Sequence, residues 1–201
     1  MSEWLAFVHL GFRHIVDVEA MDHILFLLAL AAIYRLSDWR ETLWVITAFT
    51  IGHSVTLALA VTGVLTLPSA IVEFLILVTI MITAVENLLV RDRGRAMWGG
   101  RYRVAFAGVF GLVHGAGFAT YLRSLFMDRV AVPLFGFNVG IELGQIVVLI
   151  AAFAVLHALD AAIARVRLPA RAPTPLRVRV LAVSSLVAVV AAHWAIERAP
   201  W

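Results

Sequence analysis

Imidazole and carboxylate side chains recur inside stretches of this sequence that are otherwise apolar. A charged side chain at the centre of a lipid bilayer costs about 2.5 to 3.5 kcal/mol or more, so such residues in membrane segments usually have a function. The residues that we expect to bind a ligand directly are His14, Asp22, His23, His53, His114 and Glu142. Those that we expect to support these ligands or to line a path are Asp17, Glu19, Glu86, Asn138 and Gln145.

The side-chain chemistry of this set favours a divalent transition metal. Imidazole nitrogen and carboxylate oxygen suit cations such as Ni, Co, Zn, Fe and Mn, whereas Cu(I) prefers the sulfur of Cys or Met. The sequence has no Cys, and its five Met residues are scattered along the chain. We therefore predict that the ligand is a divalent metal ion (Ni, Co, Zn or Fe), and the residue types leave the choice among these open.

Four of these residues lie at a similar depth in their apolar segments. At a rise of about 1.5 Å per residue, they lie roughly 14 to 18 Å from the segment ends; they are His23, His53, His114 and Glu142. The hydrocarbon core of a bilayer is ~30 Å thick, so all four fall near its midplane. One buried polar residue would be explained as a contact between helices, but four at one depth favour a functional site.

The elements that hold these residues must be transmembrane helices, because the composition leaves too little charge for a soluble surface. Of the 201 residues, 63% are hydrophobic and 14% are charged, and the mean hydropathy is +0.97. Soluble domains carry about 25% charged residues. All 16 basic residues are Arg. Although the pI is near 10.2, we expect these residues to set membrane topology rather than to bind nucleic acid.

The hydropathy pattern predicts an all-α, polytopic bundle of six transmembrane helices that forms a single domain over residues 1–201. A membrane-spanning helix needs about 20 apolar residues, and glycine and proline turn signals separate the segments. The predicted helices cover residues 21–34, 42–61, 68–90, 104–125, 133–164 and 178–196. The amphipathic stretch 4–19 either extends the first helix backward or forms an extra helix at the membrane interface.

The distribution of Arg predicts the orientation of the bundle. Twelve of the 16 Arg residues lie in the loops after the first, third and fifth helices, and four lie on the opposite side. Because cytoplasmic loops are enriched in basic residues, both termini are expected outside the cytoplasm. We expect a multi-pass protein of a bacterial inner membrane, with the lipid bilayer and a metal ion as its partners. The sequence leaves open whether the chain forms a homo-oligomer.

The fifth predicted helix separates a polar face from a packing face. Three polar residues follow one another at i, i+4 and i+7 and therefore share a face; they are Asn138, Glu142 and Gln145. Another face carries a row of glycines that permits close helix packing; they are Gly136, Gly140 and Gly144. The glycines around His114 likewise allow either close backbone approach or local unwinding around a ligand.

Five sequence blocks, in order along the chain, resemble the HupE/UreJ family. They are Leu10-Gly-Phe-Arg-His-Ile with Asp22-His-Ile-Leu-Phe-Leu-Leu, Thr47-Ala-Phe-Thr-Ile-Gly-His-Ser-Val-Thr-Leu57, Ala84-Val-Glu-Asn-Leu88, Phe110-Gly-Leu-Val-His-Gly-Ala-Gly-Phe118 and Phe137-Asn-Val-Gly-Ile-Glu-Leu-Gly-Gln145. The likeness covers about residues 10–150. The first block departs from the family pattern, because Asp17-Val-Glu-Ala-Met21 stands where the family commonly has a Gly shortly before Asp-His.

That family is described as nickel/cobalt permeases associated with hydrogenase and urease systems. The resemblance implies that the family's histidine and other polar residues map onto His14, Asp22, His23, His53, Glu86, His114, Asn138 and Glu142. It also implies that the substrate is a divalent metal ion, and it supports a divalent metal in general more strongly than nickel in particular.

Our leading hypothesis is a metal permease rather than an enzyme. The cation would pass the acidic stretch near the N-terminus, bind among the midplane residues, and leave past Glu86 toward the cytoplasm. An alternative is an intramembrane metal-dependent hydrolase, since three His and a carboxylate around Zn also form a catalytic site. A third hypothesis is a proton-coupled structural or sensor protein that holds no metal.

Overall fold

The computed structural model describes residues 3–18, 21–90, 101–118, 131–166 and 173–201 of the chain. All regular elements within these ranges are helices, so the predicted all-α class is confirmed. The α-helices are α1 (Glu3–Val16), α2 (Met21–Ala31), α3 (Trp39–Val61), α4 (Ser69–Leu89), α5 (Tyr102–Gly117), α7 (Ala131–Arg165) and α8 (Pro175–Glu197). A short 3₁₀ helix, η1 (Leu36–Asp38), leads into α3.

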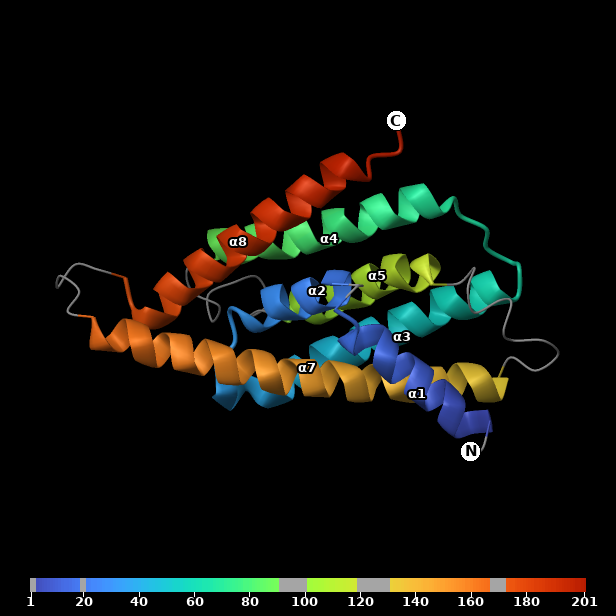
Figure 1. The fold of residues 1–201 in the computed structure, drawn as a ribbon, viewed down its shortest axis with the longest axis horizontal. Helices are drawn as coiled ribbons and strands as arrows, with labels where there is room; N and C mark the ends of the chain where they lie inside the picture. The colour runs from blue at the N-terminus through green and yellow to red at the C-terminus, as the bar shows by residue number, and fades with distance from the viewer. Residues whose placement is uncertain (1–2, 19–20, 91–100, 119–130, 167–172) are drawn as a thin grey trace.

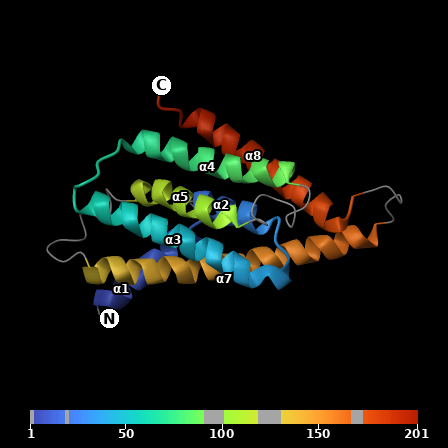
Figure 2. The same ribbon diagram turned by 180° about the vertical axis from the view of Figure 1, so that it is seen from behind.

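Most helices follow the long axis of the molecule (Figure 1). On one side α4 and α8 pack against each other, and on the opposite side α3, α7 and α1 lie together (Figures 1 and 2). Between these two groups run α2 and α5, which occupy the middle of the bundle. The central position of α2 and α5 explains why the apolar core contains side chains from both.

Four of the described helices are long and apolar enough to cross a membrane. These stretches are Leu36–Val61, Ser69–Leu89, Ala131–Arg165 and Pro175–Glu197. The protein is therefore a multi-pass membrane protein of helical type. The predicted total of six spans and the predicted orientation stay predictions, because α1, α2 and α5 are only 14, 11 and 16 residues long.

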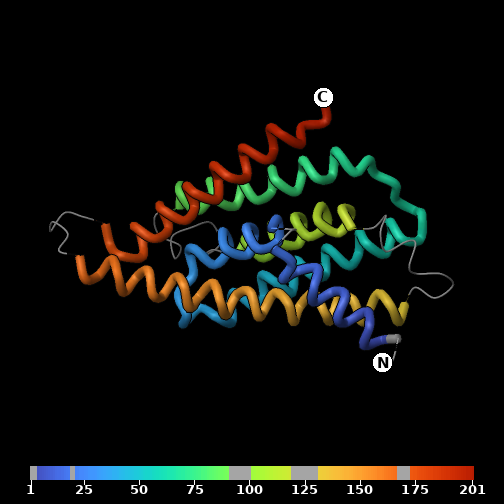
Figure 3. Tube along the Cα trace, in the orientation of Figure 1, coloured from blue at the N-terminus to red at the C-terminus, as the bar shows by residue number. Residues whose placement is uncertain are grey.

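The N-terminal segment contains two separate helices where one extended helix was considered. The first, α1, lies across α7, whereas α2 lies in the middle of the bundle (Figure 3). The chain leaves the helical conformation at Asp17 and Val18. Aspartate and β-branched valine both have low helix propensity, so this sequence favours a helix end at that point.

The row of glycines on α7 packs against α1, as the sequence predicted. A Cβ atom placed on Gly140 would overlap the carbonyl oxygen of Val8, and one on Gly144 would lie 2.8 Å from Cβ of Ile15. The approach is mutual, because a Cβ atom on Gly11 would overlap the carbonyl oxygen of Phe137. The backbones of α1 and α7 are thus in direct contact, which only glycine permits.

The same kind of contact joins α3 to α5. A Cβ atom on Gly111 would overlap the carbonyl oxygen of Phe49, and one on Gly115 would overlap that of His53. Both glycines flank His114, and α5 is helical through this region. Of the two roles predicted for these glycines, close backbone approach is the one that the structure contains.

Several predicted helix boundaries are wrong: the first predicted helix ends at Ala31 and not at residue 34, and the second begins at Trp39 and not at residue 42. The fourth predicted helix was expected to reach residue 125, but α5 ends at Gly117 and Phe118 forms a turn; residues 119–130 lie outside the described part of the chain. Glycine disfavours a helix interior by about 1 kcal/mol relative to alanine, which accounts for the early end. The sixth predicted helix begins three residues earlier than expected, at Pro175, because Thr174 accepts a hydrogen bond from the Arg177 amide and caps it.

Two arginines of α8 bind helix C-termini instead of standing in a loop. Arg179 donates to the carbonyl oxygens of Ala32 and Tyr34, just past α2, and to the carboxylate of Asp160. Arg177 donates in the same way to the last carbonyl groups of α4. The final carbonyls of a helix have no partner within the helix. These guanidinium groups therefore fix the ends of two central helices to α8.

Candidate metal centre

Three imidazole rings from three helices meet in the interior of the protein. His14 lies in the last turn of α1, His23 in the first turn of α2, and His53 in the middle of α3. One ring nitrogen from each lies within 4.8 Å of the other two. The ring centroids are 4.6 Å apart for His14 and His23 and 6.4 Å apart for His23 and His53. We call these three residues the histidine cluster.

Five of the six ring nitrogens of this cluster are buried and have no hydrogen-bond partner among the described residues. His53 is fully buried and His23 is 6% exposed. Both ring nitrogens of each lack a hydrogen bond, and so does Nε2 of His14. More than nine in ten buried polar groups in proteins have a partner. Several unsatisfied nitrogens that converge on one point are what a ligand-binding site requires.

A fourth imidazole, that of His114 on α5, stands beside the cluster. Its ring centroid is 5.4 Å from that of His23. Its Nε2 atom lies 3.0 Å from the hydroxyl oxygen of Thr79, which donates its own proton to the carbonyl of Ile76 at 2.7 Å. A hydroxyl has one proton, so with that proton on the Ile76 carbonyl Nε2 of His114 is the donor in the first contact. In that tautomer Nδ1 carries a lone pair, and it is buried without a hydrogen-bond partner among the described residues.

The spacing of the cluster fits a bound transition metal after a small movement. A metal held by imidazole at about 2.0–2.1 Å places tetrahedral ligand nitrogens about 3.3 Å apart. The nitrogens of the cluster lie within 4.8 Å of one another, so rotation of the rings about their side-chain bonds is enough to close the gap. The residue types agree with the metals predicted from the sequence, since the donors are imidazoles and no thiolate exists in the chain.

The two helix ends at the cluster act on a cation in opposite directions, because His23 lies in the first turn of α2, where the helix carries partial positive charge. The C-terminal end of a helix carries partial negative charge from its unpaired carbonyl groups. His14 belongs to that last turn of α1. Membrane transporters build substrate and ion sites from discontinuous helices of this kind, with half-helix C-termini and free carbonyls facing the cation.

Of the predicted acidic residues near the N-terminus, Asp22 is engaged by an arginine. Its carboxylate forms an ion pair at 3.6 Å with Arg198, which follows α8. The guanidinium of Arg198 also lies 5.6 Å from the ring of Trp194. Asp17 lies half-buried directly after α1, and Glu19 lies outside the described residues. The structure thus places Asp22 next to His23 in the chain, with its carboxylate turned to the C-terminal segment.

The polar face predicted for α7 turns toward α3. Glu142 accepts a hydrogen bond of 2.7 Å from the hydroxyl of Thr47, and Gln145 accepts one of 2.9 Å from Thr50. The side-chain oxygen of Asn138 is buried without a hydrogen-bond partner among the described residues. Since Thr47 precedes His53 by nearly two helical turns, Glu142 stands beside the cluster rather than within the group of three nitrogens.

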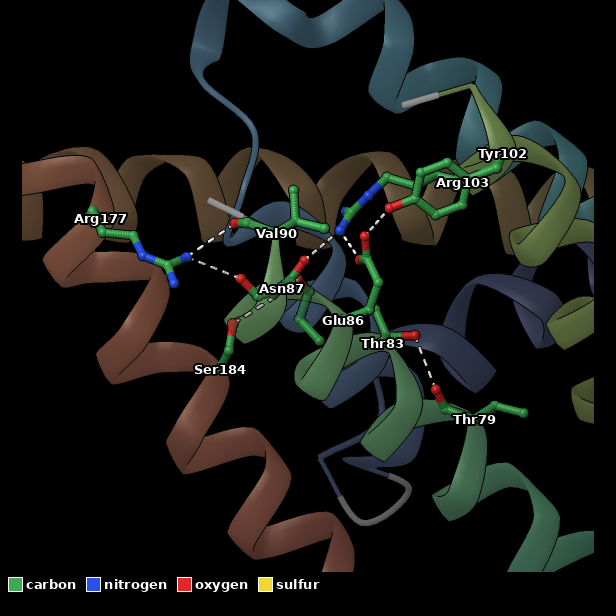
Figure 4. Close-up of polar contacts among 10 residues, drawn as sticks. Thr79, Thr83, Glu86, Asn87, Val90, Tyr102, Arg103, Arg177 and Ser184 are labelled. Carbon is green, nitrogen blue, oxygen red and sulfur yellow. Dashed lines mark hydrogen bonds and ion pairs between the residues drawn. The ribbon is translucent and has the colours of Figure 1, made fainter. Parts of the chain in front are cut away.

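Glu86 lies in the last turn of α4, inside a polar network (Figure 4). Its carboxylate accepts hydrogen bonds from the hydroxyl of Tyr102 and from the guanidinium of Arg103. Arg103 donates in addition to the side chain of Asn87 at 2.7 Å. Asn87 itself donates to Ser184 of α8. The network joins α4, α5 and α8 at one end of the bundle.

Several of these partners were not expected from the sequence. In the sequence, nothing distinguishes three threonines from other residues of apolar helices; they are Thr47, Thr50 and Thr79. Arg103 is likewise one of many arginines that we expected to set the membrane topology. Helical spacing contained one usable signal: residues 79, 83 and 86 of α4 are at i, i+4 and i+7, so two threonines share a face with Glu86.

The fold and the cluster define a helical membrane protein with converging imidazoles in its interior. A family model described as HupE / UreJ protein matches residues 1–198 of the chain. The chain belongs to the HupE/UreJ family, as the sequence blocks had indicated, and it is therefore a membrane protein related to metal transport. Neither a comparison with curated proteins nor one with solved structures gave a match.

Proposed function

We propose that this protein is a permease for a divalent transition-metal ion of the nickel/cobalt type. The observation that carries the proposal is the histidine cluster: three imidazoles, two of them buried and one partly buried, with one nitrogen from each converging to within 4.8 Å, and five of the six ring nitrogens buried without a hydrogen-bond partner in the described part of the chain. His114 is the natural fourth ligand, because Thr79 holds its ring with Nδ1 free. Asn138 and Gln145 lie on the helix face that carries Glu142, and we assign them supporting roles.

The charge of the cation must be offset inside the membrane. Four neutral imidazoles leave a divalent ion with its full charge in apolar surroundings, which is unfavourable without a nearby anion. Two carboxylates are candidates for this role: Asp22, next to His23 in the chain, and Glu142 on α7, whose partner Thr47 lies nearly two helical turns before His53. We infer that they bind or neutralise the cation when it arrives, and that their present partners, Arg198 and Thr47, hold them in its absence.

We further propose that the protein lies in a bacterial inner membrane with both termini outside the cytoplasm. The positive-inside distribution of arginine supports this orientation. The junction of α1 and α2 would then receive the cation from the outer side. The network around Glu86, in the last turn of α4, would then face the cytoplasm.

Metal uptake into proteoliposomes tests this function. Purified wild-type protein and the variant His53→Ala are compared for uptake of Ni, Co, Zn, Fe and Mn, each at equal protein density. We expect saturable uptake of at least one ion by the wild type and a loss of at least tenfold in the variant. Equal uptake by the two proteins for every ion, or none above empty liposomes, would contradict the proposal; a metal-dependent hydrolase would give the second result.

A further inference from the structure

A cavity of about 130 Å³ is lined by residues of α2, α3, α4 and α5, among them Phe26, whose ring lies against His114. A space needs about 10–15 Å³ of such volume to hold one water molecule, so this one has room for several waters or for a cation with part of its hydration shell. Its walls change character along its length. Phe26 and Phe110 form one end, and Glu86, Arg103 and Thr83 form the other.

Two phenylalanine rings pack against His114 beside the cavity. Phe26 lines the cavity, and its ring centroid is 5.3 Å from that of His114. Phe49 stacks on Phe26 at 4.8 Å and lies 5.0 Å from His114. Both rings are almost completely buried. The ring of Phe26 thus borders both the imidazole of His114 and the cavity, and Phe49 packs against both rings.

Three oxygen-bearing side chains follow one another along α4 (Figure 4). Thr79 contacts His114, Thr83 lies one turn further on, and Glu86 comes nearly one turn after that. The hydroxyl of Thr83 donates to the carbonyl of Thr79 at 2.9 Å. Its lone pairs are therefore available to accept or to bind a cation. The oxygens of Thr79, Thr83 and Glu86 therefore lead from His114, beside the cluster, to the polar end of the cavity.

The polar end already contains a cation from the protein itself. Arg103 is 7% exposed and forms an ion pair with Glu86, which Tyr102 also contacts. Nε of Arg103 has no hydrogen-bond partner among the described residues. A buried guanidinium that is incompletely satisfied is less strongly held than one with all its donors paired. A metal ion that reached Glu86 would compete with Arg103 for the carboxylate.

From this geometry, and resting on the proposed function, we infer that the cavity is the inner half of the cation path. Displacement of the Phe26 ring connects the histidine cluster to the cavity, and the cation then exchanges imidazole nitrogen for the oxygens of Thr83 and Glu86. Arg103 replaces the cation on Glu86 after release and keeps the inner end closed. The ring of Phe26 thus blocks the path until it moves, and the ion pair of Arg103 with Glu86 closes its inner end.

The chain contains no cysteine, so single cysteines report directly on access to the cavity. We compare Thr83→Cys, which lies in the cavity wall, with Val85→Cys, which lies on α4 but faces outward with 42% exposure. Membrane vesicles of either orientation are treated with a cationic, membrane-impermeant methanethiosulfonate during nickel transport. We expect the cysteine at 83 to react at least tenfold faster than that at 85, from the cytoplasmic face only.

A second variant tests the barrier itself. Adding Phe26→Ala to Thr83→Cys should make the cysteine reactive from both faces, while nickel binding to the purified protein shows that the fold and cluster persist. Equal reactivity at 83 and 85, or unchanged one-sided reaction after Phe26→Ala, would overturn the inference. So would reaction at 83 only with a lipid-soluble maleimide, because the exposed rim residues Ile82 and Phe106 would then admit an acyl chain. The uptake assay of His53→Ala is independent, so failure of the path and failure of the metal site are told apart.

Discussion

The hydroxyl group of Thr79 on α4 lies 3.0 Å from Nε2 of His114 on α5. When the Thr79 hydroxyl donates to the carbonyl of Ile76, Nε2 of His114 donates to Thr79 and Nδ1 keeps its lone pair. Histidine ligands in metal proteins almost always have such a partner on the ring nitrogen that does not bind the metal. The pair therefore links the sequence of an apparently ordinary apolar helix to the chemistry of the metal site.

Replacing Thr79 by valine should weaken metal binding. Loss of an outer partner of a histidine ligand commonly reduces metal affinity about 10–100-fold, and valine keeps the shape of threonine without the hydroxyl. Thr79→Ser should keep most of the affinity. Titration calorimetry of the purified protein with nickel measures the effect. Thr42→Val is the matched control, because Thr42 is also buried and its hydroxyl also donates to a backbone carbonyl, that of Asp38, about three turns before His53; equal affinities for the two valine variants would refute the assigned role.

The contact between α3 and α5 should tolerate a methyl group at one glycine and not at another. A Cβ atom on Gly111 would overlap the carbonyl oxygen of Phe49, whereas one on Gly108 would lie 3.6 Å from that of Ala48. We expect Gly111→Ala to destabilise the fold by about 1–3 kcal/mol, as overpacking does, and Gly108→Ala to have little effect. Thermal unfolding in detergent measures both, and equal melting temperatures would show that the two helices are not in backbone contact.

Neutralising Arg198 should improve metal uptake at low concentration. Arg198 occupies the carboxylate of Asp22, which is next to His23. The pair is partly exposed, and such pairs contribute roughly 0.2–1 kcal/mol. Arg198→Gln should therefore lower the apparent KM for the metal about two- to fivefold, whereas Glu197→Gln, which changes only an exposed contact with His193, should not. An unchanged or higher KM in Arg198→Gln would show that Asp22 takes no part in binding the incoming cation.

Arg179 should be required for the stability of the bundle. It is 3% exposed and bonds to Asp160 and to two carbonyl groups beyond α2. Removing one member of a buried ion pair typically costs about 3–5 kcal/mol, a value that partial exposure of Asp160 reduces. We expect Arg179→Met to lower the melting temperature by several degrees, and Arg40→Met, at an exposed position, to leave it unchanged. A similar loss in both variants would assign the effect to net charge.

The sequence was sufficient to predict the helical class and most of the helices. Long apolar runs admit no other structure in lipid, because every backbone group must be paired within the segment. Boundaries failed where glycine or a local cap decided them, at Gly117 and at Thr174. The sequence left open whether the N-terminal stretch continues the first helix or forms an extra one, since Asp17 and Val18 interrupt the helix with no glycine or proline to mark the place; the structure contains two separate helices.

The candidate site was predicted in part. Depth along the helices brought His23, His53 and His114 to one level, and the structure places these rings side by side. His14 joined them through the family resemblance rather than through depth. Hydrogen bonds between helices, such as that of Thr47 to Glu142, depend on how each helix is rotated. Periodicity within a single helix carries no information on that rotation, so these partners could not be predicted.

The central claim is that the converging imidazoles bind the metal, and X-ray absorption at the metal edge tests it most directly. Zinc- or nickel-loaded protein should show three or four imidazole nitrogens, for zinc at about 2.0–2.1 Å, with no sulfur scatterer. In His53→Ala the number of imidazoles should fall by one. A shell of oxygen atoms alone, identical in the wild type and in His53→Ala, would contradict the account.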